Sequence, residues 1–567
     1  MKISTLTLLL AATVAGAHAE IKESAKDAVK NMGVGWNLGN TLDASKSKEG
    51  AKPSDASYWG TQGVESETYW GQAITKPELM TMMKNAGFDA IRVPITWYNH
   101  MDKDGKVDAA WMKRVHEIVD YVIDNGLYCI INVHHDTGAD SNTYSSWIKA
   151  DEENYKTNKA RFEGLWTQIA NEFKDYDEHL LFAGYNEMLD IKSSWCFASF
   201  AATGQYDAAI AESAYKGINN YAQSFVNTVR ATGGNNKTRN LIVPTYAAAC
   251  GEGNWNKHLS DPLSQMNLPK DETSGHIIFE VHTYPNISSG NITSIKSNVD
   301  QIIKTINDNL VSKGAPVIFG EWGTSNVDAS VTDYDARKSL MFQFVDYFVQ
   351  QTKANGMGTF YWMGLTDGMY RSMPAFNQPD LAERIAKAYH GSDFKGEYPE
   401  PAKSTSYDLV SEPMKFMNWG DPRLQISKEY FQSIEKDIQL TLTYTFVNDN
   451  EDMQFFYGDW SSKPDFIVDE EVISGDYFPH VAHADTETCT TTFKFSEAVC
   501  KELTKRGLIL FGHNFTVTKA VLSNAAASGI EEIEEVSDAE GPVYNLFGQQ
   551  SKAEGFVIRN GKVLYVK

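Results

Sequence analysis

The sequence has no surplus of positive charge, no long apolar run beyond its first residues and no glycine-rich phosphate loop. Its net charge of −23 at pH 7 argues against nucleic acid and anionic membranes as partners and suits a neutral ligand. After the N-terminal stretch, no segment is long and apolar enough to span a bilayer. The missing phosphate loop counts against a doubly wound open sheet.

Cysteine is scarce, and the number of cysteines is odd. Five cysteines leave at least one thiol unpaired within a monomer. Cys129 lies inside an apolar run, which predicts a buried free thiol. Cys196 with Cys250, and Cys489 with Cys500, are pairs that could form bridges, and their spacing does not decide the matter.

The first 19 residues have the pattern of a secretory signal peptide. Lys2 supplies the charged start, residues 6–14 form a short apolar stretch, and Ala17 and Ala19 mark a small-residue cleavage site. No cysteine stands at that site, which argues against a lipoprotein anchor. We therefore expect a secreted or cell-surface protein whose mature chain begins near Glu20.

The length of 567 residues exceeds what one hydrophobic core usually serves, so two or more domains are expected. Between residues 20 and 391, short apolar runs typical of buried strands alternate with helical patterns. The expected strands span residues 33–39, 89–95, 128–134, 180–187, 240–246, 276–284, 315–323 and 358–364. Eight strands with helical crossovers predict an α/β fold, a (β/α)8 barrel enlarged by insertions. An open doubly wound sheet is the alternative.

Between these runs, apolar residues recur at the i, i+3, i+4 spacing of a helix with one buried stripe. The stripes comprise Trp111, Val115, Ile118, Val119, Val122 and Ile123; Ile218, Tyr221, Ala222, Phe225, Val226 and Val229; and Val299, Ile302, Ile303, Ile306 and Leu310. Gly126, Gly233 and Gly314 follow the three stripes, as expected where a helix closes with a positive φ.

After residue 391 the helical period is replaced by short runs in which apolar and polar residues alternate. A linker rich in proline, glycine and charge is expected at residues 392–403, and short alternating runs at 439–446, 490–495, 507–512 and 515–522 predict an antiparallel β-sandwich over residues 404–524. Residues 525–540 read as a small-residue, acidic linker. Residues 541–567 read as a short β tail, similar in composition to the C-terminal tails of proteins exported by Gram-negative anaerobes.

Two of the expected strands end in glutamate. Glu187 and Glu321 stand 134 residues apart, so only the fold can bring them together. Carboxylates just past barrel strands lie at the rim where barrel enzymes keep their chemistry. Two carboxylates across a cleft can divide the roles needed to break a glycosidic bond. An isolated glutamate would more simply end a strand at the surface.

Polar and aromatic residues gather at the ends of the other expected strands as well. They are Trp36, Asn37 and Asn40; Arg92; His134, His135 and Asp136; Asn186; His282 and Tyr284; and Trp362. A cation near a carboxylate lowers its pKa and keeps it ionised, whereas an acid in drier or more anionic surroundings stays protonated.

These residues occur in motifs that resemble glycoside hydrolase family 5. The motifs are Arg92-Val-Pro, Val133-His-His-Asp136, Asn186-Glu187, Val281-His-Thr-Tyr284, Gly320-Glu-Trp-Gly323 and Phe360-Tyr-Trp362. Gly35-Trp-Asn-Leu-Gly-Asn40 and Ala86-Gly-Phe88 are most similar to the endo-β-1,4-glucanases of that family. The resemblance covers residues 31 to about 390.

The resemblance implies a retaining mechanism, with Glu187 as acid/base and Glu321 as nucleophile. It further implies that Arg92 and Tyr284 support the nucleophile and that His282 neighbours the acid/base. His134 and Asn186 would bind near the −1 sugar, with Trp362 as the floor of that subsite; the family relies less on His135. Glu187 and Glu321 are then expected at the ends of strands four and seven, with carboxyls about 5–5.5 Å apart.

Other interpretations of the same residues remain open. His134, His135 and Asp136 suggest a metal site, but adjacent strand residues point to opposite faces, so we expect no metal. Arg92 alone could be a structural ion-pair partner. Each of Trp59, Trp70, Trp97, Trp147 and Trp195 either stacks on further sugars or packs its own loop. Phe455, Phe456, Tyr457, Trp460 and Phe466 form either a glycan-binding platform or a core strand.

The sequence thus predicts a secreted, monomeric endo-β-1,4-glucanase that binds a β-glucan polysaccharide and needs no cofactor. Another family 5 specificity is the alternative: xyloglucanase, mixed-linkage glucanase or mannanase. A non-catalytic glycan-binding surface protein with a degenerate barrel is the rival from a different class.

Overall fold

The structure is a computed structural model of the chain. It describes residues 21–46, 50–138, 145–194, 206–251, 258–285, 287, 291–324, 334–401, 404–410, 412–417, 419, 422–434, 437–446, 452–477, 488–524, 555–559 and 562–566. The chain forms two compact units, Met1–Pro401 and Ala402–Lys567, and each is described by itself. The expected signal peptide, the 525–540 linker, Trp195 and Cys196 lie outside the described residues.

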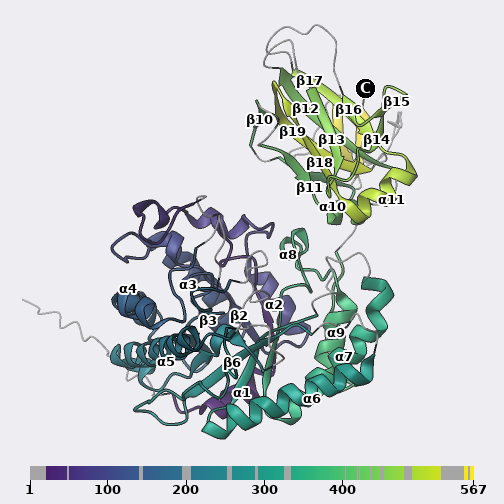
Figure 1. Ribbon diagram of the computed structural model, residues 1–567. Helices are drawn as coiled ribbons and strands as arrows, with labels where there is room; N and C mark the ends of the chain where they lie inside the picture. The colour runs from purple at the N-terminus through teal and green to yellow at the C-terminus, as the bar shows by residue number, and fades with distance from the viewer. Residues whose placement is uncertain are drawn as a thin grey trace, which may run out of the picture. The chain divides into compact units, whose positions relative to one another are not determined.

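The first unit is a closed barrel of eight parallel strands in the order of the sequence (Figure 1). The strands are β1 (Val34–Asn37), β2 (Ala90–Val93), β3 (Tyr128–Asn132), β4 (Leu180–Ala183), β5 (Leu241–Pro244), β6 (Ile277–Thr283), β7 (Val317–Trp322) and β8 (Gly358–Tyr361). β1 pairs with β8 and closes the ring. The predicted barrel is confirmed, and the open-sheet alternative is wrong.

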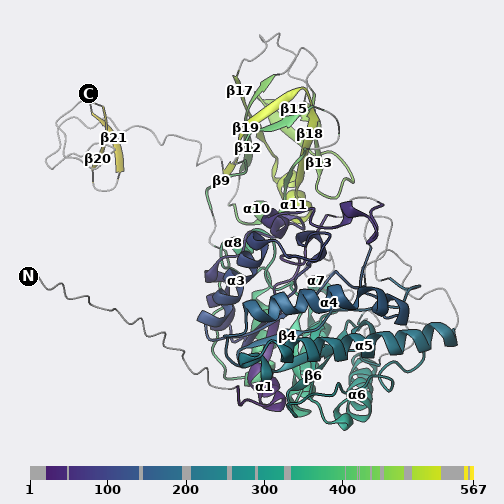
Figure 2. The same cartoon turned by 90° about the vertical axis from the view of Figure 1, so that its left-hand side faces the viewer.

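Helices surround the barrel. They are α1 (Ala25–Met32), α2 (Pro77–Asn85), α3 (Ala109–Asp124), α4 (Glu152–Glu172), α5 (Ala208–Ala231), α6 (Ile292–Asn309), α7 (Tyr334–Ala354), α8 (Met369–Ser372) and α9 (Pro379–His390). Short 3₁₀ helices span Ala56–Tyr58, Val64–Thr68, Tyr98–His100, Gly234–Lys237, Tyr246–Ala248 and Val311–Lys313. Figure 2 shows α4 and α5 running side by side across β4.

The helices begin and end where the sequence supplies the required groups. Asp108 caps α3 by accepting from the backbone N–H groups of Ala110 and Trp111, and its apolar stripe from Trp111 to Val122 is buried. Gly126, Gly233 and Gly314 have φ of 69°, 74° and 101°, so the predicted closures with positive φ are confirmed.

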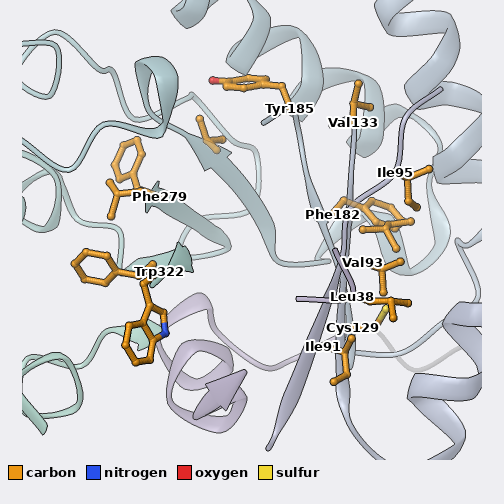
Figure 3. Close-up of a cluster of buried hydrophobic side chains, with 14 of the residues drawn as sticks. Leu38, Ile91, Val93, Ile95, Cys129, Val133, Phe182, Tyr185, Phe279 and Trp322 are labelled. Carbon is orange, nitrogen blue, oxygen red and sulfur yellow. The ribbon is translucent and has the colours of Figure 1, made fainter. Parts of the chain in front are cut away.

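Alternation along each strand divides the barrel into two layers. One set of side chains, such as Ile91, Val93 and Phe182, packs against the surrounding helices (Figure 3). The other set faces the axis, where Ile130, Ile242 and further apolar residues pack with α1. This apolar plug fills the N-terminal part of the barrel and leaves the carboxyl ends of the strands for polar side chains.

A β-bulge in β7 breaks this alternation. Val281 of β6 pairs with Phe319, but the next residue, His282, pairs with Glu321, so Gly320 is the extra residue. Phe319 and Trp322 both pack against Phe348 of α7 on the outside of the barrel. With two residues between these outward side chains instead of one, Gly320 and Glu321 both face inward. The bulge therefore turns Glu321 into the barrel, opposite His282.

The second unit is an antiparallel β-sandwich, as predicted. Its larger sheet has the order β10-β19-β12-β17-β14-β15, with β9 beside β19, and its smaller sheet has the order β11-β18-β13-β16. The strands are β9 (Ser406–Asp408), β10 (Met414–Phe416), β11 (Leu424–Ile426), β12 (Ile438–Phe446), β13 (Asp452–Tyr457), β14 (Asp465–Val468), β15 (Glu471–Ser474), β16 (Asp476–Tyr477), β17 (Thr488–Lys494), β18 (Leu508–His513) and β19 (Phe515–Asn524).

Some elements of this unit were not predicted from the sequence. They include α10 (Lys428–Gln432) and α11 (Glu497–Arg506), the second of which connects β17 to β18. The C-terminal segment was predicted as a short β tail, and there β20 (Gly555–Arg559) pairs with β21 (Lys562–Val566). In the described part of the chain, no helix has the length and apolar character of a membrane span.

Two cysteine predictions meet the structure. Cys129 is a buried free thiol, as predicted. Cys500 is also a free thiol, with its Sγ 3.7 Å from the carbonyl oxygen of Phe495, so the bridge to Cys489 that the spacing allowed does not form.

Candidate active site

The site is built at the carboxyl ends of the barrel strands. β2 places Arg92, the turn after β4 places Asn186 and Glu187, β6 places His282, and the bulge in β7 places Glu321. The fold brings together residues that lie far apart in the sequence, as predicted.

Arg92 is the fully buried centre of this arrangement. Its Nη1 donates to Asn37 Oδ1 at 2.9 Å and to Glu321 Oε1 at 3.0 Å, and its Nη2 donates to Asn186 Oδ1 at 2.8 Å. Its Nε lies 2.9 Å from Glu280 Oε1. The planar guanidinium therefore fixes two amides and two carboxylates relative to one another.

Both oxygens of Glu321 are held. Oε1 accepts from Arg92, and Oε2 accepts from the hydroxyl of Tyr284 at 2.7 Å. His282 Nδ1 lies 3.5 Å from Oε2. Burial raises the pKa of Glu321 above its usual value, and the positive charges of His282 and Arg92 offset only part of that rise. The expectation that the neighbouring cation lowers the pKa of this carboxyl is therefore wrong, because burial outweighs the charge. The two hydrogen bonds therefore fix the orientation of the Glu321 carboxyl group.

His282 lies between two further carboxylates. Its Nδ1 is 2.8 Å from Glu187 Oε1 and its Nε2 is 3.1 Å from Glu280 Oε1. Carboxylates only accept, so both contacts are hydrogen bonds when the imidazole is doubly protonated. Burial lowers the pKa of His282, but Glu321 and the hydrogen bonds to Glu187 and Glu280 outweigh burial and raise it to about 9. The ring is therefore a cation at neutral pH.

Glu280 is a member of the site that the sequence analysis missed. It is fully buried, and its Oε1 faces both Arg92 Nε and His282 Nε2. Burial raises the pKa of Glu280, but the positive charges of Arg92 and His282 outweigh burial and lower it. A Cβ at Gly320 would lie 1.9 Å from that Oε1, so the glycine leaves the space that Glu280 occupies.

His134 is held as a neutral ring. Asn132 Oδ1 accepts from the backbone N–H of Ile95, which turns the amide Nδ2 toward His134 Nδ1 at 3.0 Å. Nδ1 is therefore an acceptor, and burial moves the pKa of His134 well below its usual range. The single proton lies on Nε2, which is 3.9 Å from Glu321 Oε1 and directed into the site.

The strand argument against a shared metal at His134 and His135 is wrong. β3 ends at Asn132, so the two histidines do not alternate across a sheet, and their ring centroids are 4.4 Å apart. His135 Nε2 lies 3.5 Å from Asp43 Oδ2, and one ligand atom from each of Asp43, His134 and His135 lies within 4.8 Å of the others. Asp136 belongs elsewhere, since it accepts from the backbone of Trp97 and Tyr98.

Residues 49–366 match the family model "Cellulase (glycosyl hydrolase family 5)". The chain belongs to glycosyl hydrolase family 5. It is a glycoside hydrolase with endoglucanase activity, so the predicted family and enzyme class are confirmed, and the non-catalytic rival is wrong.

Several relatives of this family 5 enzyme are known. It is 33% identical to Endoglucanase B of Neocallimastix patriciarum over 404 residues, which are 69% of this chain and 76% of that protein. The structure of a broad specificity endoglucanase from an uncultured bacterium is 64% identical, with a TM-score of 0.60, over 65% of this chain and 96% of that chain. A mutant of a family 5 enzyme from Prevotella bryantii B14, in complex with the xyloglucan tetradecasaccharide XXXGXXXG, is 40% identical, with a TM-score of 0.55, over 66% of this chain and 100% of that chain.

The tryptophans of this family 5 enzyme form two groups, those that are partly exposed beside the site and those that are buried. Trp362 is half-buried and parallel to the His134 ring, with centroids 5.9 Å apart, and Gly39 makes room for its indole. Trp36 is fully buried and donates to the carbonyl oxygen of Met363 at 3.0 Å, so it supports the loop after β8 and does not line the site.

The tryptophans in the loops follow the same division. Trp59, Trp97 and Trp147 are buried; Trp59 packs against Trp147, and Trp97 donates to the carbonyl oxygen of Asn132. Trp70 is half-buried beside His135, with ring centroids 5.2 Å apart. Of these loop tryptophans in the part of the chain that the structure describes, only Trp70 is exposed enough to stack on a sugar.

Proposed function

We propose that this enzyme cleaves internal β-1,4-glucosidic bonds of β-glucans by a double displacement that retains the anomeric configuration. The observation that carries the proposal is the separation of the two carboxylates. One ligand oxygen of Glu187 lies within 4.8 Å of one of Glu321. Retaining enzymes hold their carboxyls about 5–5.5 Å apart, whereas inverting enzymes need roughly 6.5–9.5 Å to admit a water molecule.

Glu321 suits the role of nucleophile. Arg92 and Tyr284 orient its two oxygens, so the attack on the anomeric carbon needs no side-chain rearrangement. The carboxylate loses its charge when it forms the glycosyl ester and regains it on hydrolysis. The buried cations Arg92 and His282 offset part of the cost of burying the charged form, which favours departure of the carboxylate in the second step.

Glu187 suits the role of acid/base. Its side chain is 21% exposed, whereas that of Glu321 is 6% exposed, so a leaving group and then a water molecule can reach it. In the first step it gives a proton to the glycosidic oxygen, and in the second it takes a proton from water. His282 holds its Oε1 while this proton moves.

The neutral His134 and the indole of Trp362 suit the −1 subsite. The Nε2 proton of His134 is available to a sugar hydroxyl, because Nδ1 is engaged with Asn132. The partly exposed face of Trp362 offers a surface for a pyranose ring. Arg92 Nη2 donates to Asn186 Oδ1, which leaves the amide nitrogen of Asn186 as the donor for a sugar hydroxyl.

Azide rescue tests the two roles separately. With an activated aryl glycoside, azide supplied to Glu321→Ala should give the inverted glycosyl azide, and azide supplied to Glu187→Ala should give the retained one. The matched control is Glu153→Ala, since the Glu153 side chain is 79% exposed on α4 and pairs with Lys156 of the same helix. The opposite pattern of products would mean that the roles are exchanged.

The range of substrates is a separate part of the proposal. Relatives include broad specificity endoglucanases and an enzyme bound to a xyloglucan oligosaccharide, so we propose that xyloglucan and mixed-linkage glucan are cleaved as well as cellulose. Reducing-sugar release on these three glucans and on mannan measures the range. Activity on mannan alone would overturn the assignment to β-glucans.

We further propose that residues 1–19 direct export, that the mature enzyme is a monomer and that it needs no cofactor. N-terminal sequencing of protein recovered outside the cells should begin near Glu20. Light scattering of the purified protein should give the mass of one chain, and dialysis against a chelator should leave its activity unchanged.

A further inference from the structure

The outer face of the smaller sheet of the sandwich carries a cluster of five aromatic rings. Phe456 of β13 and Phe511 of β18 have centroids 5.6 Å apart, and Trp460 lies 5.3 Å from each of them. Trp419 lies 5.5 Å from Phe511 and 4.7 Å from His513. We call Trp419, Phe456, Trp460, Phe511 and His513 the aromatic platform.

The platform is separate from the core of the sandwich. In β13, Phe455 and Tyr457 point inward and are buried, whereas Phe456 between them is only partly covered. Trp419 and Trp460 are 44% and 42% exposed. Two indoles that remain nearly half exposed contribute little to the hydrophobic core. A continuous exposed apolar patch usually marks a binding surface.

The backbone of Trp460 is strained to hold this position. Its φ is +60°, a left-handed conformation that is unfavourable for a bulky residue. Arg506 fixes the turn that contains Asp459 and Trp460, because Asp459 accepts from its Nε and Nη2. The Arg506 guanidinium lies 3.7 Å from the centroid of the Tyr457 ring. The N–H of Trp460 donates to the carbonyl oxygen of Tyr457 at 2.8 Å. A strained residue that its surroundings hold firmly in place points to a function for its side chain.

Polar side chains surround the rings. Arg423 lies 5.3 Å from the Trp460 ring and Lys463 lies 5.1 Å from the Phe456 ring. Gln425 of β11 is exposed beside them, and Gln454 of β13 is partly exposed. Flat apolar faces with hydrogen-bonding groups at their edges match a pyranose ring, which has an apolar face and hydroxyls at its rim.

We propose that the aromatic platform binds a β-glucan chain, with Trp419 and Trp460 stacking on sugar rings on either side of Phe511. Both indoles neighbour Phe511, at 5.5 Å and 5.3 Å between ring centroids, so one extended chain can contact both of them. The choice of β-glucan as the ligand rests on the proposed function of the barrel. Binding by a second site of the same chain would keep the enzyme on its polymer through avidity.

The test uses the full chain carrying Glu321→Ala, so that the polymer is not degraded. Depletion from solution by insoluble cellulose, and retardation in gels containing soluble xyloglucan or mixed-linkage glucan, measure binding. Each of Trp419→Ala and Trp460→Ala should weaken binding by roughly five-fold, and the double variant by roughly twenty-five-fold. The matched control is Val472→Ala, which removes a 71% exposed apolar side chain of the larger sheet.

Two further measurements keep the outcomes distinct. Turnover of a soluble aryl cellobioside is measured with Glu321 in place, and it should be equal in Trp419→Ala, Trp460→Ala, the double variant and Val472→Ala. If all of these chains are inactive, the proposed function fails while the binding result stands. Thermal unfolding of the double variant should match that of the control. If the double variant binds as well as the control, the proposal is wrong. A lower melting temperature in that variant would then show that the aromatic platform packs against protein.

Discussion

Replacing Glu280 by glutamine removes one negative charge from the buried part of the site with little change in shape. The carboxylate Oε1 faces His282 Nε2 at 3.1 Å and Arg92 Nε at 2.9 Å. A glutamine carbonyl oxygen can accept from both donors, so the Glu280→Gln chain should fold. What it loses is the charge that balances two buried cations.

Two quantities measure that loss. In Glu280→Gln each of the two contacts changes from an ion pair to a hydrogen bond with one charged partner. If each contact is weakened by about 1 kcal/mol, the free energy of unfolding falls by about 2 kcal/mol. The pKa of His282 is raised from 6.5 to about 9. At about 1.4 kcal/mol per pH unit, that difference is worth roughly 3.5 kcal/mol, of which Glu280 supplies only a part beside Glu321 and Glu187.

The direction of the pH dependence follows from the sign of this shift. Because the folded-state pKa of His282 lies above its ordinary value, the stabilisation is complete below pH 6.5 and is lost as the pH rises through about 9. The wild-type chain should therefore lose stability over that interval. In Glu280→Gln the pKa of His282 should fall toward 6.5, and the loss should be smaller and should occur at lower pH.

The assay is an NMR titration of ¹³C-labelled histidine rings, with His282→Asn to assign the resonance. In the same samples, kcat/KM should fall roughly ten- to a hundred-fold in Glu280→Gln, because His282 orients the carboxyl group of Glu187 through its Oε1. Glu153→Gln is the control for removing an exposed carboxylate. If His282 titrates near pH 9 in both chains and kcat/KM is unchanged, Glu280 does not act through His282.

Two further predictions concern the nucleophile and the sandwich. Tyr284→Phe removes the hydroxyl that donates to Glu321 Oε2 at 2.7 Å, and kcat should fall roughly ten- to a hundred-fold with little change in thermal unfolding, while an unchanged kcat would show that Arg92 alone orients the carboxylate. Deletion of residues 403–567 should leave turnover of soluble substrate largely intact and weaken retention on insoluble glucan; equal retention by a folded, truncated chain would assign the sandwich a structural or export role.

Periodicity was sufficient to predict the barrel because its elements follow simple rules. Each expected strand is an apolar run bounded by turn residues, and each contains the observed strand, although the observed strands are shorter. The runs continue past the last paired residue because the loops at the carboxyl ends, such as the one bearing Tyr185, are also buried. The sequence therefore overstates strand length where the site begins.

The details of the site depend on features that periodicity does not contain. The bulge at Gly320 breaks the alternation that predicts which side chains face inward. The sequence does contain a pattern that predicts Glu280 as a site residue. It is a lone charge within the apolar run of β6, two residues before His282, and therefore lies on the same face of the strand. In the sandwich, the aromatics around Trp460 divided between core and surface, because neighbouring strand residues point to opposite sides.

Gly320 connects the bulge to the charge network, and a double-mutant cycle tests that connection. Its φ is not positive, so alanine is disfavoured there by sterics and not by backbone conformation. The added methyl group would lie 1.9 Å from Glu280 Oε1, and Glu280 cannot move without breaking its contacts with Arg92 and His282.

Gly320→Ala should therefore lower kcat/KM about a hundred-fold or more. In a Glu280→Ala background the same substitution finds space, so it should cost little more. The coupling between the two positions should be about 1–3 kcal/mol, measured from kcat/KM of the four chains and checked by urea unfolding. If the two effects simply add, the glycine is needed for the bulge itself, because a side chain at this position would then obstruct the turn of Glu321 into the barrel whatever occupies position 280.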